Sequence, residues 1–321
     1  MNNYSITQRV LHRIALSSNF LKKIYFDYEK TFFLKQSNII DDNHVFIAGM
    51  ARSGTTSILS AIYSTEEFAS LTYKDMPFIL CPNLWSKLNT KGITINKQQR
   101  AHNDGIDIDT SSPEAFEEVF WKTFDCNDLE TNIEFTNFIK LLCFKYKRNR
   151  YLSKNNQNIK RIDYLNKNYP LSRIIIPFRN PLQQAFSLYN QHEHFLGLQR
   201  QDRFIKNYMF WIGHSEFGID YKPITNENLE FDNYKELDHW LEQWFHLYQN
   251  LYYHKSNDKV LFVCYEDLCN DDRTWKSILS FININNFRNF NFKESVKEIQ
   301  LPYNSDLYNE CISVYKRLKD Q

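Results

Sequence analysis

The chain has 321 residues, of which 42% are hydrophobic, and a formal net charge of +1 at pH 7. That length allows one large domain with a sizeable core or two smaller ones, and the balanced charge argues against a general nucleic-acid binder. Six cysteines without a CxxC pair argue against a zinc ribbon or a disulfide framework. No apolar run could cross a membrane and no signal-peptide core is visible, so we expect a soluble cytoplasmic protein.

Residues 1–40 are predicted to form a basic amphipathic helical segment. Apolar residues recur at helical spacing, with basic residues between them. They are Leu11, Ile14, Leu21, Tyr25, Tyr28 and Phe32, with Arg9, Arg13, Lys22 and Lys23 as the basic ones. Two interpretations stay open: a helix packed on the domain surface, or a face that contacts a partner or the inner face of the membrane.

Residues 41–321 are predicted to form a single α/β domain. Short buried strands at 45–49, 173–179 and 259–268 are each followed by a helical pattern. This alternation is typical of a three-layer α/β/α fold with a mainly parallel central sheet. A long amphipathic helix is expected over 234–254, with Trp240, Trp244 and Leu247 inward.

The middle of the chain is harder to interpret. The stretch 145–161 is rich in Asn, Lys and Arg, so we expect solvated surface there. Residues 80–170 as a whole are where we expect insertions that bind an acceptor.

The stretch "GMARSGTT" (49–56) predicts a phosphate-binding loop. Gly49 and Gly54 have the G-x-x-x-x-G spacing between a strand and a helix. The N–H groups of Ser53, Gly54, Thr55 and Thr56 are expected to point at an anion where a helix begins. The lysine of nucleoside triphosphatases is absent, because Thr55 and Thr56 follow the second glycine. A cation, Arg52, precedes the Ser-Gly-Thr-Thr turn instead.

A second anion-binding element is predicted in "RIIIPFRNPLQQAFSLYNQ" (173–191). Arg179 stands at a strand end, Asn180 suits the N-cap and Pro181 the first helical position. We expect Leu182, Phe186 and Tyr189 to form the buried face of the helix. Gln183, Ser187, Gln191 and His194 would form its polar stripe. Arg179 can make a forked pair with a phosphate, to which Ser187 can add a hydroxyl bond.

Together these two elements resemble the sulfotransferases that use 3′-phosphoadenosine 5′-phosphosulfate (PAPS). In that family, a cation before a Ser-Gly-Thr-Thr-like turn holds the phosphosulfate. An Arg and a Ser eight residues apart hold the 3′-phosphate. The resemblance covers about residues 45–284 and looks closer to the bacterial and Golgi-type carbohydrate branch. It implies PAPS as co-substrate, no metal, and a carbohydrate or glycolipid acceptor. The glycine-rich C-terminal segment of the cytosolic branch is not visible.

The resemblance also implies a base for the acceptor hydroxyl, and two candidates stay open. Lys74 and Asp75, in "SLTYKDMPF" (70–78), look like the Lys-Glu pair of carbohydrate sulfotransferases, with Asp in place of Glu. His102 is the alternative, because an imidazole has a suitable pKa. Arg52 is expected to neutralise charge on the departing phosphate.

We interpret Glu266 and Asp267, at the end of the third strand, as structural. "HEH" (192–194) lacks metal-ligand spacing, so His194 is expected at the mouth of an acceptor cleft rather than at a metal. Two alternative functions remain: a nucleotide or small-molecule kinase with an atypical loop, and a catalytically silent relative that binds a glycan or a protein partner.

Overall fold

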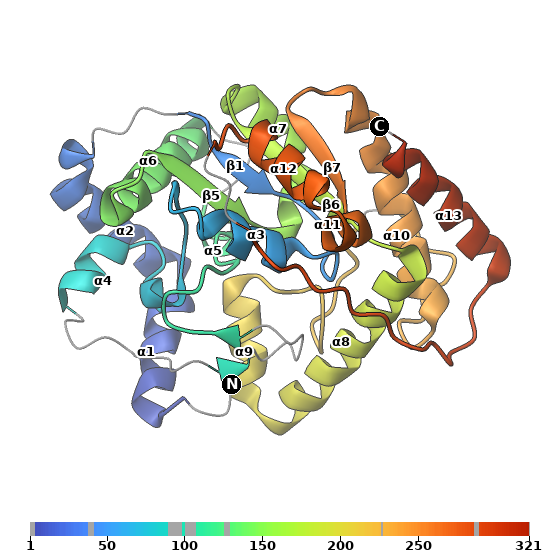
Figure 1. Ribbon diagram of the computed structural model, residues 1–321. Coiled ribbons are helices and arrows are strands. Elements are labelled where there is room, and N and C mark those ends of the chain that lie inside the picture. The colour runs from blue at the N-terminus through green and yellow to red at the C-terminus, as the bar shows by residue number, and fades with distance from the viewer. Residues whose placement is uncertain are drawn as a thin grey trace.

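A five-stranded, all-parallel sheet forms the centre of the molecule (Figure 1). The computed structural model describes residues 4–37, 42–88, 98–99, 107–124, 129–225, 227–285 and 289–320. In sheet order the strands are β2 (Phe68–Ala69), β5 (Arg150–Lys154), β1 (Val45–Ile47), β6 (Arg173–Phe178) and β7 (Val260–Cys264). A small antiparallel pair, β3 (Gln98–Gln99) and β4 (Asp107–Ile108), lies outside it. The predicted parallel sheet is confirmed.

Helices cover both faces of the sheet, which confirms the three-layer α/β/α architecture (Figure 1). Alternate side chains of β1 point to opposite faces: Val45 and Ile47 join one buried cluster, and Phe46 joins the other. The first face carries α3 (Thr55–Tyr63), α11 (Tyr265–Asn270) and α12 (Asp272–Phe281). The second carries α6 (Leu129–Tyr146), α7 (Ile162–Asn168), α8 (Pro181–Gln201), α10 (Leu237–Leu251) and α13 (Ser305–Lys319).

Shorter helices complete the fold. They are α4 (Pro82–Leu88), α5 (Glu118–Trp121) and α9 (Arg203–Ile212), with 3-10 turns η1 (Leu34–Gln36), η2 (Tyr73–Asp75), η3 (Asn156–Arg161) and η4 (Tyr252–Ser256). The helix predicted over 234–254 is α10, and Trp240, Trp244 and Leu247 are buried as expected.

The N-terminal segment forms two helices, α1 (Ile6–Leu16) and α2 (Asn19–Phe33), because Ser18 caps a second start. Their buried apolar side chains are Ala15, Leu16, Phe26 and Phe33, which pack into the same core as the sheet. The predicted stripe has a different orientation: Ile14, Leu21, Tyr28 and Phe32 are 41–58% exposed. The spacing of the apolar residues correctly predicted helices, but many of these residues lie on the exposed side of the helices.

The interpretation of residues 145–161 as solvated surface was wrong, because this stretch contains β5. Leu152 pairs in register with Val45 of β1 and is fully buried. Arg150, at the start of β5, has hydrogen-bond partners for its charged group. Its guanidinium donates to the carbonyls of Asn43 and Ile282, at 2.8 and 2.7 Å. The basic residues mark the ends of a buried strand here. Much of the surrounding 80–170 range, including Phe120, also packs into the core.

Candidate nucleotide site

The predicted phosphate loop joins β1 to α3, as expected. Gly54 has a left-handed φ of 90°, and a Cβ there would lie 2.1 Å from the ring of Tyr265. Arg52 also has a positive φ, 68°, which is uncommon for a residue with a side chain. The first-turn N–H groups of α3 have no intrahelical partner, so the loop presents donors together with the positive end of the helix dipole.

The residues of this loop do not all face the same way. Arg52, Gly54, Thr55 and Thr56 line a cavity of about 620 Å³. The side chain of Ser53 is fully buried, and its hydroxyl donates to the carbonyl oxygen of Met50 at 2.8 Å. The Ser53 hydroxyl therefore shapes the turn and does not line the cavity.

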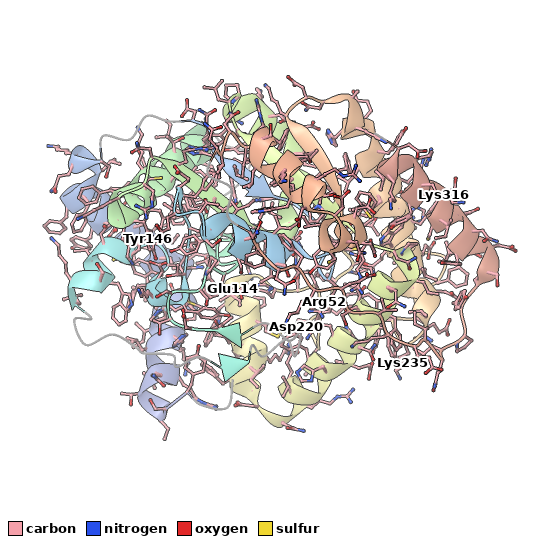
Figure 2. All side chains as sticks on the ribbon, viewed as in Figure 1. Arg52, Glu114, Tyr146, Asp220, Lys235 and Lys316 are labelled. Atoms are coloured by element: carbon pink, nitrogen blue, oxygen red, sulfur yellow. The ribbon has the colours of Figure 1, made fainter. Side chains whose placement is uncertain are left out.

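The second predicted element reaches the same cavity. Arg179 follows β6, and Asn180 caps α8 by accepting from the Gln183 N–H at 3.1 Å. Arg179 and Ser187 line the cavity beside the phosphate loop. Arg52 Nε donates to Ser187 Oγ at 2.9 Å, so the two elements are in direct contact. Figure 2 shows Arg52 near the middle of the molecule.

The cavity lies at the carboxyl ends of four neighbouring parallel strands. Lys154 ends β5, the phosphate loop follows β1, Arg179 follows β6, and Tyr265 follows β7; all of them line it. In open α/β sheets, ligands bind in the crevice at this edge.

The carboxamide of Gln184 ties the loop to the rest of the fold. It donates to the Ala51 carbonyl and accepts from the indole N–H of Trp244, both at 3.0 Å. Because of these bonds, Gln184 is fully buried on α8. Leu182, Phe186 and Tyr189, which were predicted to form the buried face of this helix, are only partly buried.

The segment 290–297 contributes residues to the site that the sequence did not predict. It runs between α12 and α13 and crosses the front of the molecule as an irregular red chain (Figure 1). Lys293 and Lys297 line the cavity. Gln183 fixes this segment by bonding both the N–H and the carbonyl of Lys297, at 2.9 Å each. The segment has no periodic pattern, so only its lysines could have suggested an anion site.

The charge of the cavity suits a multiply charged anion. Its described lining carries five cationic side chains and one acidic one, Glu294; the cations are those of Arg52, Lys154, Arg179, Lys293 and Lys297. Arg179 donates to the Ser295 carbonyl, but its buried Nε makes no hydrogen bond in the described structure. The nearest carboxylate oxygen, Glu266 Oε1, is 3.8 Å away. A buried donor of this kind is costly unless a ligand satisfies it.

The acids at the end of β7 have structural partners. Glu266 Oε1 accepts from the Asn180 N–H at 2.8 Å, and Asp267 pairs with Lys319 at 2.7 Å. This agrees with the structural role expected for them.

Asp75 lies away from the cavity, which argues against its predicted role as the base. It is fully buried and pairs with Lys145 Nζ at 2.5 Å. Its other oxygen accepts from Tyr146 at 2.7 Å and from the Thr72 N–H at 2.7 Å. Figure 2 shows Tyr146 well apart from Arg52. With these partners, Asp75 joins η2 to α6. The other candidate, His102, lies outside the described residues.

Two further predictions concern His194 and metals. His194 is partly buried on α8 and is not among the residues lining the cavity. Within the described residues, no group of three or more His, Cys, Asp or Glu side chains could hold a metal ion. No helix in that part of the chain is long and apolar enough to cross a membrane.

Known proteins resemble this chain in family and in fold. The model of the sulfotransferase family matches residues 44–288, so the chain belongs to that family. Sulfotransferase STF1 from Mycobacterium tuberculosis H37Rv is 9% identical, with a TM-score of 0.51 over 99% of this chain and 87% of its own. Sulfotransferase STF9 from Mycobacterium avium is 12% identical, with a TM-score of 0.48 over 100% and 80%. At 9% identity, the likeness to STF1 concerns the fold alone. A search of curated proteins finds no match.

Proposed function

We propose that the protein transfers a sulfuryl group from PAPS to a hydroxyl of a carbohydrate or glycolipid. The observation that carries this proposal is the shared cavity, in which the phosphate loop and the Arg179–Ser187 pair meet. The first would hold the 5′-phosphosulfate and the second the 3′-phosphate. Lys293 and Lys297 would add positive charge from the C-terminal side.

In this reaction the acceptor oxygen bonds to sulfur, and the bond from sulfur to the 5′-phosphate oxygen breaks. The leaving nucleotide keeps the electron pair. Arg52 is suited to stabilise the charge that develops on the departing phosphate, as preorganised cations do in phosphoryl transfer. The first-turn amides of α3 add donors that are in place before the reaction begins.

We propose His214 as the group that accepts the hydroxyl proton. Within the described cavity lining, imidazole and carboxylate groups come from His214 and Glu294. Burial raises the pKa of Tyr265 to about 12, so this phenol is a poor base near neutral pH. His214 is favoured over Glu294 because it also lines the neighbouring cavity of about 510 Å³. Its Nε2 lies 3.3 Å from the Ala115 carbonyl, and its Nδ1 lies 3.7 Å from Glu216 Oε2.

Exposed side chains of α1 and α2 support a contact with the inner face of the membrane, where a glycolipid acceptor would be found. Ile6 and Phe20 are 83% and 73% exposed, and Val10, Ile14, Tyr28 and Phe32 are each more than half exposed. Exposed Arg13, Lys23 and Lys35 accompany them. An apolar face with basic neighbours is suited to anionic lipid.

Transfer of radioactive sulfate from labelled PAPS into a lipid and glycan extract tests the proposed reaction. We expect label in an acceptor with the wild type. We expect at least a hundredfold loss in His214→Gln, with binding of 3′-phosphoadenosine 5′-phosphate (PAP) retained. PAP binding without any transfer would favour a silent relative, and preference for ATP with Mg²⁺ over PAP would favour a kinase.

A further inference from the structure

A second cavity, of about 510 Å³, adjoins the nucleotide cavity. His214 and Phe217 line both, so these two residues mark the boundary between them. The second cavity is lined by residues of α5, η3, α8, α9 and the loop that follows α9. A molecule held there would lie next to the reacting end of the donor that we propose.

Four lysines line this second cavity: Lys122, Lys160, Lys206 and Lys222. Lys206 pairs with Asp220, at 3.1 Å. The remaining acidic group of the lining is that of Glu118, which Arg161 holds with two bonds of 2.8 and 2.9 Å. The lining therefore carries four ammonium groups and two carboxylates, an excess of two positive charges apart from His214. Glu216, near Lys160, offsets part of that excess.

Lys122 lies near charges of both signs. Burial lowers its pKa, the Glu118 carboxylate raises it, and the nearby charge of Lys222 lowers it by a smaller effect. Its ammonium lies 4.0 Å from the centre of the Phe210 ring and donates to the Phe210 carbonyl. An anion in the cavity would relieve the repulsion between these lysines.

The loop that carries Lys222 is held in place by its own bonds. Gly213 has a φ of 83°, and a Cβ there would lie 2.3 Å from the Glu118 side chain. The Lys222 N–H donates to the Ser215 carbonyl at 2.8 Å, and the Ile219 N–H donates to Gln199 at 2.7 Å. The backbone that carries Lys222 is therefore fixed, which reduces the entropy lost when a ligand binds.

We propose that this lysine-lined cavity binds a phosphate or carboxylate group of the acceptor and so directs its hydroxyl to His214. This inference rests on the proposed sulfuryl transfer, and it narrows the acceptor class to an anionic, hydroxyl-bearing molecule such as a sugar phosphate or a uronic acid. A neutral sugar would lack the group that Lys122, Lys160 and Lys222 recognise.

Calorimetric titration of the PAP-saturated protein tests the inference, because PAP keeps the probe out of the nucleotide cavity. The probes are glucose 6-phosphate, glucuronate, inorganic phosphate and glucose. We expect at least one of the two anionic sugars to bind at least tenfold more tightly than glucose and than inorganic phosphate. That binding should weaken at least tenfold in Lys160→Ala and Lys222→Ala. Both lysines are exposed, so these variants should fold.

Lys316→Ala is the matched control, since Lys316 is an exposed lysine on α13, at the outer edge of the molecule and far from Asp220 in Figure 2. It should bind the probes as the wild type does. The inference is overturned if neither anionic sugar binds more tightly than glucose, or if the two cavity variants bind like the control. Failure of PAP itself to bind would count against the proposed function. The same titration without PAP, with Arg179→Ala as a further control, would then still test whether the lysine-lined cavity binds anionic sugars.

Discussion

Arg52 Nε donates a 2.9 Å hydrogen bond to Ser187 Oγ, across 135 positions of sequence. One residue belongs to the loop after β1 and the other to the helix after β6. Because β1 and β6 are neighbours in the parallel sheet, their carboxyl ends bring the two segments together. This contact joins the two elements that we propose to bind anions, as a shared ligand with two phosphates would require.

Gly54 is predicted to be intolerant of any side chain. Gly54→Ala adds a Cβ that meets the Tyr265 ring and strains a left-handed backbone, so we expect the free energy of unfolding to fall by about 2–4 kcal/mol. Urea denaturation measures this change. Gly197→Ala is the matched control, because its new methyl group meets nothing within 4 Å, and helix propensity should make it neutral or stabilising. Equal stability of the two variants would contradict the described packing of Tyr265.

Asp75 is predicted to act in folding rather than in proton transfer. Asp75→Asn leaves Lys145 partly buried without its charge partner, which should cost about 3–5 kcal/mol of stability. Turnover of the folded fraction should change less than about threefold, because the carboxylate lies outside the cavity. Lys74→Ala, at an exposed neighbour, should change neither quantity. A large loss of turnover at full stability would restore Asp75 as the base.

His192 is predicted to make the fold sensitive to acid. Burial lowers its pKa to about 4, and neither ring nitrogen has a hydrogen-bond partner in the described structure. The unfolded chain takes up the proton near pH 6.5, whereas the folded protein does so only near pH 4. The free energy of unfolding should therefore decrease as the pH falls from 6.5 to about 4, by up to about 3 kcal/mol from this residue.

His192→Phe should remove that part of the acid sensitivity, because the ring packs among Tyr221, Tyr234 and Trp240 without needing a polar partner. Denaturation at a series of pH values measures the difference. His12 and His239, whose pKa values burial also lowers, will leave some sensitivity. An unchanged pH profile in the variant would contradict the assignment to His192.

The exposed face of α1 and α2 is predicted to bind anionic lipid. Replacing Phe20 and Phe32 by serine removes exposed apolar surface without changing the core, so binding to phosphatidylglycerol vesicles should fall at least tenfold. Sedimentation with vesicles measures it. Tyr253→Ser is the control, because Tyr253 is a similarly exposed aromatic residue on η4. Unchanged vesicle binding in the double variant would contradict a role of this face in lipid binding.

The sequence predicted those parts of the candidate site in which a residue both sets the local backbone conformation and lies beside the cavity. Gly54 marks a loop whose backbone requires a glycine, Arg52 supplies the charge beside it, and Asn180 marks a helix start, so neighbouring residues were sufficient. The proximity of distant segments was predicted only through the family resemblance, as for the phosphate loop and Ser187. Asp75 resembled a catalytic base until its partner Lys145, 70 positions away, was known.

Two other features were missed for related reasons. β5 carries polar and basic residues, and its burial depends on carbonyls supplied by segments far along the chain. The segment 290–297 has no secondary structure of its own, and its position beside the phosphate loop depends on contacts with distant residues, among them Gln183, Tyr265 and Arg179.

Calorimetric binding of PAP and 5′-AMP to the wild type, Arg52→Ala and Arg179→Ala tests most directly whether the two elements hold one nucleotide. The wild type should prefer PAP, because 5′-AMP lacks the 3′-phosphate. Arg179→Ala should weaken PAP about tenfold to a hundredfold and leave 5′-AMP nearly unchanged, since a charge-assisted bond contributes about 1.5–3 kcal/mol. Arg52→Ala should weaken both ligands. If Arg179→Ala keeps the full preference for PAP, the two elements do not share a nucleotide.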